Sequence, residues 1–255
     1  MINTGTWFNF ESWPPVDASP TKLFLTQNKH LGTGQLSWSQ SPHQRIAPHT
    51  SYSNNKGGGS LSYVYDPRRP TPSRGGPSFN VLNSGRCWQF PIERRSDVIV
   101  LSTAPLAEDL HVVGNVSLVA FVRCEKKCSI DIVGRLCSVT SWGLSTNVCE
   151  GLTRVKQSEM MAAAEGEGGT GWWCKVTVEL NPTAVTFIRG SRIRLQVCSG
   201  AHPRWMRNLG GSGELTDLHK EVLTPSAGPI RVELCTDSNH GSHLNISTLP
   251  VTIAG

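Results

Sequence analysis

The sequence lacks long apolar runs, which bears first on any membrane role. No stretch of its 255 residues approaches the roughly 20 consecutive apolar residues that a membrane-spanning helix needs. The opening residues, MINTGTWFNFESWPP, have neither a charged leader nor the apolar core of a signal or transit peptide. We therefore expect a soluble, cytoplasmic protein with no membrane partner.

Concentrated charge is also missing. The net charge is +5, from 24 lysines and arginines against 19 acidic residues. The basic residues are scattered in pairs such as Arg68/Arg69 and Arg94/Arg95, whereas nucleic-acid-binding proteins usually carry a continuous basic stripe. A solvated surface is the simpler interpretation, and we expect no nucleic-acid partner.

The residue patterns of common catalytic sites are absent or misplaced. An α/β-hydrolase nucleophile needs G-x-S-x-G between a strand and a helix, and the near matches Gly143–Asn147 and Gly210–Glu214 each lack the second glycine. GEGGTG at Gly166–Gly171 precedes a strand-like run, the reverse of the dinucleotide-binding order. His240 and His243 lie among Ser, Asn and Gly, so a surface loop is expected. We expect no catalytic residue and no cofactor.

Eight cysteines raise the question of disulfides or a metal site. Several lie inside strand-like runs, Cys137, Cys174 and Cys198 among them. Cys124 and Cys128 flank two lysines, but no second pair or spaced histidine completes a zinc site. We expect reduced, buried cysteines with a structural role and no bound metal.

What the sequence does contain is a series of short β-branched runs between turn residues. Its 25 glycines and 16 prolines favour short strands and tight turns over long helices. Met160–Glu165 is the one short helix candidate. We predict an all-β fold, a jelly-roll β-sandwich of about ten to twelve strands. The strand-like runs are 22–26, 36–38, 97–103, 111–123, 129–140, 145–151, 172–180, 191–198, 230–236 and 243–251.

One long stretch carries a family resemblance. Asn181–Glu214, NPTAVTFIRGSRIRLQVCSGAHPRWMRNLGGSGE, resembles the C-terminal domain of the cocaine esterase and X-Pro dipeptidyl-peptidase family of serine hydrolases. Tyr65–Gly76, Ile92–Gly114 and Asn147–Val155 match in the expected order. The opening Thr6–Pro15 is similar to the segment that enters this domain from the catalytic domain.

The resemblance implies a galactose-binding-like jelly roll that is not catalytic. In the family this domain follows an α/β-hydrolase domain and a helical cap, which hold the catalytic Ser, Asp and His. No position of this sequence matches those residues. The resemblance implies a connector over residues 1–20 and a jelly-roll domain over residues 21–255. It also implies a parent enzyme that hydrolyses esters or peptides, of the dipeptidyl-peptidase type.

Two groups of residues are candidates for contact with a catalytic domain, in cis or in trans. In the loop after the strand at 192–198, guanidinium and amide groups can bind backbone carbonyls and fix a docking loop; the alternative is a loop that only reverses the chain. The N-terminal aromatics either form an interface, with possible self-association, or pack into the domain's own core. The loop candidates are His202, Pro203, Arg204, Trp205, Arg207 and Asn208, and the interface candidates are Trp7, Phe8 and Trp13.

Two other functions stay open at this point. A carbohydrate-binding module is one, because jelly rolls often bind sugars on exposed tryptophans and this chain has 8. An independent esterase is the other, and it requires an activated serine that the motifs do not supply.

Overall fold

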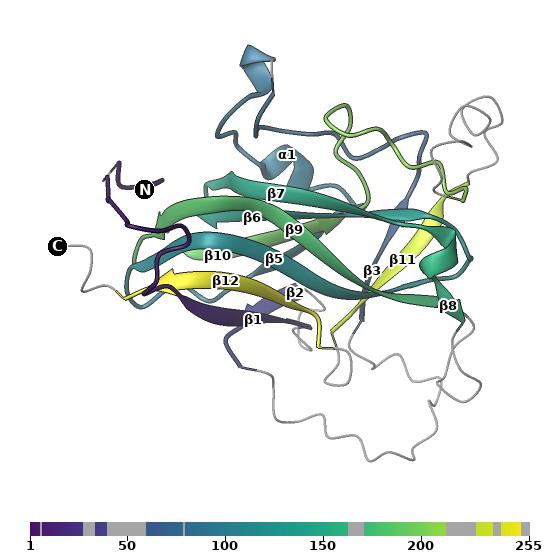
Figure 1. Ribbon diagram of the computed structural model, residues 1–255. Coiled ribbons are helices and arrows are strands. Elements are labelled where there is room, and N and C mark those ends of the chain that lie inside the picture. Colours follow the sequence, from purple (N-terminus) through teal and green to yellow (C-terminus); the bar gives the residue numbers. More distant parts are fainter. Residues whose placement is uncertain are drawn as a thin grey trace, which may run out of the picture.

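The computed structural model describes residues 1–5, 7–27, 34–39, 60–78, 80–162, 171–212, 228–236 and 241–250. These ranges contain twelve strands and three short helical turns (Figure 1). The strands are β1 (Ser19–Gln27), β2 (Gly34–Ser37), β3 (Ser60–Tyr65), β4 (Ile99–Ser102), β5 (Leu110–Cys124), β6 (Ile130–Val139), β7 (Ser145–Val155), β8 (Met161–Ala162), β9 (Trp172–Phe187), β10 (Arg192–Cys198), β11 (Ile230–Cys235) and β12 (His243–Leu249). The helical turns are η1 (Val81–Asn83), α1 (Phe90–Glu93) and η2 (Gln157–Glu159).

All twelve strands belong to one hydrogen-bonded sheet that folds over into two layers (Figure 1). The first layer runs β7-β6-β10-β4. β2 pairs in parallel with β4 and antiparallel with β1, and so leads into the second layer, β1-β12-β5-β9. β11 and β3 continue the second layer beside the end of β5.

The two free sheet edges meet and close the sandwich at one glycine. A Cβ on Gly151 of β7 would lie 1.9 Å from the carbonyl oxygen of Glu179 in β9, so no other residue fits there without moving the strands. Two residues further along β7, the Thr153 hydroxyl donates to the carbonyl of Thr177 at 2.9 Å. This contact covers edges that an open sandwich would leave exposed.

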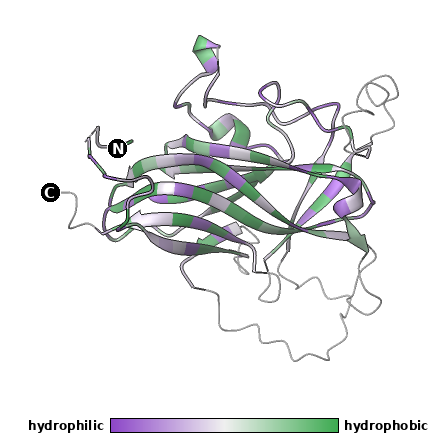
Figure 2. Ribbon diagram, in the orientation of Figure 1, coloured by the Kyte–Doolittle hydropathy of each residue, from purple (hydrophilic) through white to green (hydrophobic). Residues whose placement is uncertain are grey.

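The core follows from strand alternation, because successive side chains point to opposite faces. Along β5, Val116, Leu118, Ala120 and Val122 face inward and are buried, and Figure 2 shows apolar and polar bands alternating along the strands. β6 is buried on both faces. Its outer face is covered by α1 and neighbouring loops, with a small second cluster of Ile92, Val98, Val133, Cys198 and Ala201.

The predicted all-β sandwich is confirmed, and each predicted strand-like run overlaps an observed strand, whereas β3 was not predicted. The helix expected at Met160–Glu165 is wrong where the structure describes it: Met161 and Ala162 form β8 and pair with Trp173 and Trp172. Pairing with an available edge outweighs the high helix propensity of alanine, because a run this short cannot hold a helix by propensity alone. His243 also differs from the expected loop, since it begins β12 opposite Val119.

Some sequence predictions fall outside the described residues. These are His240, residues 213–214 and most of GEGGTG, whose residues 166–170 are not described. Among the helices that the structure describes, none has the length and apolarity needed to cross a membrane.

Candidate functional site

Residues 1–5 and 7–15 form an arch whose start is fixed to both layers of the sandwich. Ile2 pairs in parallel with Val185 of β9. Asn3 has a left-handed backbone, with φ of 81°, and its side-chain amide donates to the Thr186 carbonyl of β9 at 2.8 Å and to the Ser138 hydroxyl of β6 at 3.3 Å. We call residues 1–5 and 7–15 the N-terminal arch.

The far end of the arch is held on a glycine of β5. Gly114 has a φ of +123°, and a Cβ there would lie 3.1 Å from the Pro14 side chain and 3.3 Å from that of Ser247. The following residue, Pro15, is buried. The close approach of Pro14 therefore depends on the missing Cβ and on backbone angles that glycine adopts readily.

Between these two attachments, the arch presents aromatic side chains to solvent. Trp7 is 95% exposed and Trp13 is 51% exposed, so these two rings lie outside the core. Phe8 is half-buried and stacks on Phe10 with ring centroids 6.2 Å apart. The rings border a cavity of about 400 Å³. The backbone is thus anchored while the Trp7 side chain is almost fully exposed.

The second candidate, the loop over residues 199–212, is turned inward at Arg204 and Trp205. Arg204 forms an ion pair with Glu150 of β7, and its guanidinium lies 4.6 Å from the centre of the Trp205 ring. Trp205 packs against the second cluster on the outer face of β6. These contacts hold the middle of the loop against the sheet.

Asn208 is the most fully bonded residue of this loop. Its buried side-chain amide donates to the Ser129 hydroxyl and to the Asp131 carboxylate, each at 2.9 Å. Its side-chain oxygen accepts from the Gly210 N–H at 2.8 Å, and its carbonyl accepts from the Tyr65 hydroxyl at 3.0 Å. A single asparagine thus fixes the loop's return to the start of β6.

The remaining loop candidates are exposed side chains on an ordered backbone. His202 accepts from the Ser73 N–H at 2.7 Å through its carbonyl, and both His202 and Pro203 have exposed side chains. Arg207 donates to the Pro67 carbonyl at 3.4 Å. The expected bond to a backbone carbonyl is therefore present for Arg207. For Arg204 and Asn208 it is wrong, since both bind carboxylates.

The arch and the end of the loop are attached to opposite ends of β6. The loop returns at the beginning of β6, where Ser129 N–H donates to the Gly211 carbonyl, and the arch contacts Ser138, near the end of β6. The nine residues between these contacts span roughly 30 Å in an extended strand. The middle of the loop is closer to the arch, because Arg204 binds Glu150, which lines the same cavity as Met1 and Ile2.

A buried ionic layer under this loop was missed by the sequence reasoning. Arg135 of β6 and Glu150 of β7 are both buried, with Arg135 Nε donating to Glu150 Oε2 at 2.7 Å. Burial disfavours the charge of Arg135, but the attraction and hydrogen bond of Glu150, together with the nearby Cys198 and Cys137, outweigh it and leave the pKa of Arg135 above its ordinary value. Charged residues at alternate strand positions indicate a face in contact with water. Nothing in the sequence therefore indicated that other segments cover this face of β6. Three more ion pairs lie around this layer: Arg154–Asp131, Arg194–Glu93 and Arg95–Asp97.

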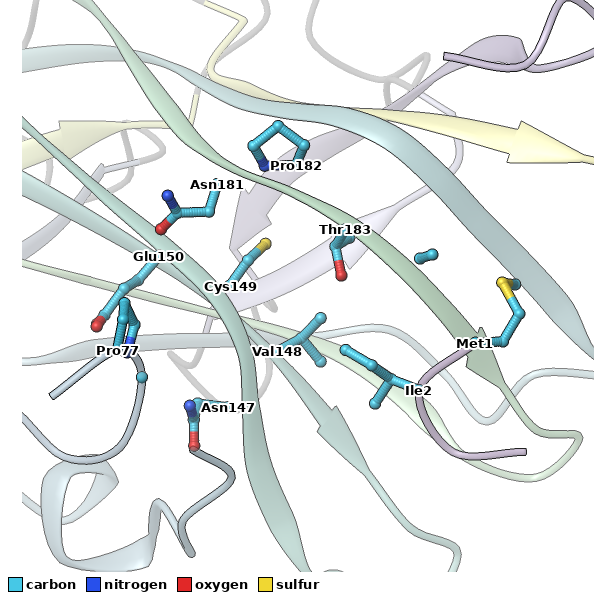
Figure 3. A pocket seen from close by; sticks show the side chains of 12 residues that line it. Met1, Ile2, Pro77, Asn147, Val148, Cys149, Glu150, Asn181, Pro182 and Thr183 are labelled. Carbon is cyan, nitrogen blue, oxygen red and sulfur yellow. The ribbon is translucent and has the colours of Figure 1, made fainter. Parts of the chain in front are cut away.

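A second cavity opens where β7 and β9 diverge (Figure 3). Its volume is about 480 Å³, with Asn147–Glu150 on one side, Asn181–Ala184 on the other and Met1 and Ile2 at one end. Burial raises the pKa of the Cys149 thiol to about 12, so this thiol stays protonated near neutral pH and is a poor nucleophile. The cavity has no group prepared for covalent chemistry.

The predicted burial of the cysteines is confirmed. Seven of the eight free cysteines are buried and Cys87 is half-buried. Cys124 donates a hydrogen bond to Cys128, which raises the pKa of Cys124 and lowers that of Cys128. Across the described ranges, no cluster of three or more His, Cys, Asp or Glu side chains is arranged to hold a metal ion.

Comparisons with known proteins agree with this architecture. A sequence model of the X-Pro dipeptidyl-peptidase C-terminal non-catalytic domain matches residues 1–241. The chain is 28% identical over 250 residues to the cocaine esterase of Rhodococcus sp. (strain MB1 Bresler), and the match covers 96% of this chain and 40% of the relative. The chain thus spans only two fifths of that relative's length.

Solved structures share the fold at low identity. An aminopeptidase from the marine sediment archaeon Thaumarchaeota archaeon aligns with a TM-score of 0.71 and 19% identity, covering 98% of this chain and 39% of that one. An alpha-amino acid ester hydrolase aligns with a TM-score of 0.64 and 17% identity, covering 89% of this chain and 36% of that one. In each case, the matched part is a minority of a longer protein.

Proposed function

Because the chain belongs to the family of X-Pro dipeptidyl-peptidase C-terminal non-catalytic domains, we propose that it supports an α/β-hydrolase catalytic domain by packing against it, in cis or in trans. The parent activity in this proposal is hydrolysis of an ester or peptide bond, of the dipeptidyl-peptidase type. Hydrolysis of an ester is supported by the name of the relative, a cocaine esterase. Hydrolysis of a peptide bond is supported by the name of the family, X-Pro dipeptidyl-peptidase.

The N-terminal arch carries this proposal. Trp7 is 95% exposed on a backbone that is anchored on either side of it. Burying a tryptophan gains much apolar contact area, and an anchored backbone loses little further entropy when a partner binds. Trp7, Phe8 and Trp13 are therefore the proposed contact residues, and they also offer a route to self-association.

For the loop over residues 199–212, the proposed role is to support the domain from within. Arg204, Trp205 and Asn208 make their contacts inside the domain. His202 and Pro203 are exposed and stay candidates for docking.

The proposal also retains the division into a connector over residues 1–20 and a domain over residues 21–255. β1 begins at Ser19, so the connector leads directly into the first strand. A reducing, cytoplasmic location is part of the proposal and is supported by the buried free thiols.

Sedimentation velocity tests docking by the arch. The chain is mixed with the separately produced catalytic portion of the Rhodococcus relative, and Trp7→Ser with Trp13→Ser is compared with wild type. Loss of two aromatic contacts is expected to weaken association by at least about tenfold. Trp38→Ser is the matched control, because Trp38 is exposed but lies outside the arch. A chain that stays monomeric at high concentration and does not bind the catalytic portion would contradict the proposal.

A carbohydrate-binding module is the second candidate, favoured by Trp142, which is 92% exposed. Exposed tryptophan rings stack on sugars in many jelly rolls. Titration against a glycan panel separates the two functions, because saturable binding at millimolar or lower concentration supports the module.

A further inference from the structure

The strand ends place several turns beside the N-terminal arch. β6 ends at Val139, which pairs with Ser145 at the start of β7 and Arg192 at the start of β10. The β6–β7 turn and the β9–β10 turn therefore lie next to each other, and a Cβ on Gly190 would be 3.8 Å from that of Ser141. Asn3 of the arch binds Ser138 on this same end of β6. In Figure 1 the arch stands at the end of the sandwich where β9 ends.

Exposed apolar side chains gather on this end. Trp142 and Leu144 belong to the β6–β7 turn, Ile188 follows β9, and Trp88 is joined to the start of β7 by a bridge to Thr146. We define the aromatic end as Trp7, Trp13, Trp88, Phe90, Trp142, Leu144 and Ile188, all of them exposed.

The distribution of tryptophans separates this end from the rest of the described surface. Trp7, Trp13, Trp88 and Trp142 lie on it, whereas Trp38, 47% exposed, is the one exposed tryptophan of the described residues elsewhere. Single exposed apolar residues are ordinary, but a gathered set marks an interaction site.

Trp88 and Phe90 are fixed in position before any partner arrives. Their rings stack with centroids 5.2 Å apart and planes within 6°. The residue between them, Gln89, is fully buried, and its N–H donates to the Ser145 carbonyl at 2.9 Å. Such a rigid pair binds with a small entropy loss.

Arginines surround the stacked pair and give the surface a basic rim. Arg94 lies 5.2 Å from the centre of the Phe90 ring. Arg74 donates to the Trp88 carbonyl at 2.6 Å, and Arg86 donates to the Thr146 hydroxyl at 2.7 Å. Tryptophan and arginine are the residues most enriched at the energetic centres of protein interfaces. A partner face with an acidic rim would complement them.

From these observations we infer that the aromatic end as a whole, from the arch to the Trp88–Phe90 pair, is the surface that contacts the hydrolase body. This inference rests on the proposed function and extends it to residues outside the arch. The match covers 40% of the cocaine esterase, so more than half of such a protein lies outside this domain. A body joined at residue 1 would be tethered beside this surface at high effective concentration.

Hydroxyl-radical footprinting of a fusion tests the inference. The catalytic portion of the Rhodococcus relative is fused to the full chain, and oxidation rates are compared with those of the chain alone. Trp88 and Trp142 are expected to become several-fold less reactive, while Trp38 and Met206, which are exposed elsewhere, stay unchanged. If Trp7 is protected but Trp88 and Trp142 are not, the inference is wrong, while the proposed docking by the arch is still supported. No protection anywhere, with no gain in the thermal stability of the catalytic portion, contradicts the proposed function as well.

A second experiment needs no partner and tests the inference even if the fusion fails to fold. Trp88→Ser with Trp142→Ser in the chain alone is expected to leave the melting temperature within about 2 °C of wild type, because exposed side chains add little to stability. Trp205→Ser, which opens a packed cluster, is expected to lower it clearly more. If the double variant loses as much as Trp205→Ser, the rings belong to the domain's own fold and the inference is wrong.

Discussion

Arg204 and Glu150, 54 positions apart in the chain, form an ion pair that joins the 199–212 loop to β7. Glu150 also binds the buried Arg135 of β6, at 2.7 Å. One carboxylate is therefore shared by two guanidinium groups in a layer that is largely buried. The loop is held in place by an ion pair whose acidic partner also serves the buried Arg135.

Glu150→Gln is expected to destabilise the domain by about 3–5 kcal/mol, because Arg135 would remain buried without its counter-charge. Urea unfolding followed by fluorescence measures this. Glu179→Gln removes an exposed carboxylate from β9 and is expected to change the free energy of unfolding by less than about 0.5 kcal/mol. Equal effects of the two substitutions would show that Glu150 has no special role.

Gly151→Ala tests the closure of the sandwich. The added methyl group would overlap the Glu179 carbonyl, since its position is 1.9 Å away, and relief requires β7 and β9 to separate. The expected cost is about 3 kcal/mol or more. Gly228→Ala is the matched control, because a Cβ there meets no atom within 4 Å. A stable Gly151→Ala variant with unchanged hydrogen exchange in β7 would refute this account of the closure.

Stability is expected to fall as the pH rises above 9. Burial raises the pKa of Cys149 and of Cys174 from 9.0 to about 12. A folded-state pKa above the unfolded value means that the folded protein keeps the proton longer, so its stabilising effect is complete below pH 9 and is lost between pH 9 and 12. Each such thiol contributes a slope of up to about 1.4 kcal/mol per pH unit.

Urea midpoints at pH 8.0 and at pH about 10.5 measure this alkaline loss. Cys149→Ala removes one of the groups that titrate, so its stability should depend less steeply on pH than that of wild type. A wild-type midpoint that is flat across this interval would contradict the prediction.

Thiol accessibility provides a separate measurement. Cys87 is half-buried, whereas the other seven cysteines are buried. Titration with a thiol reagent at neutral pH is expected to modify Cys87 first and to reach the others only after denaturant is added. Mass spectrometry of alkylated, unreduced protein is the control: two or more disulfides would contradict both this prediction and the proposed cytoplasmic location.

Most strands were predictable because their β-branched runs alternate with the pleat, but β3 and β8 were not among the predicted strands. β10 is an example, since Arg192 and Arg194 alternate with Ile193 and Leu195 and only the apolar pair is fully buried. Met161 was not predictable in the same way, because its two-residue strand exists only through pairing with Trp173 on the neighbouring strand β9. Local propensity carries no information about such a partner.

The ionic layer marks a second limit of sequence reasoning. Arg135 and Asp131 occupy outward positions of an amphipathic strand, a pattern that predicts a wet surface. They are buried because segments distant in sequence fold over that face. The N-terminal tryptophans could be named as candidates from the sequence, but their exposure depends on where the arch is attached, which only the fold decides.

The attachment of the arch has a mechanical consequence. Ile2 lies alongside β9, and Asn3 reaches across to β6, so a load applied at residue 1 enters both layers before it reaches the rest of the arch. Here the Ile2 N–H donates to the Ala184 carbonyl at 2.8 Å and the Thr186 N–H donates to the Ile2 carbonyl at 3.0 Å. With the two side-chain bonds of Asn3, four hydrogen bonds share such a load. A polypeptide joined at residue 1 would therefore be firmly coupled to the sandwich. A rotation of that polypeptide would be transmitted to the sandwich.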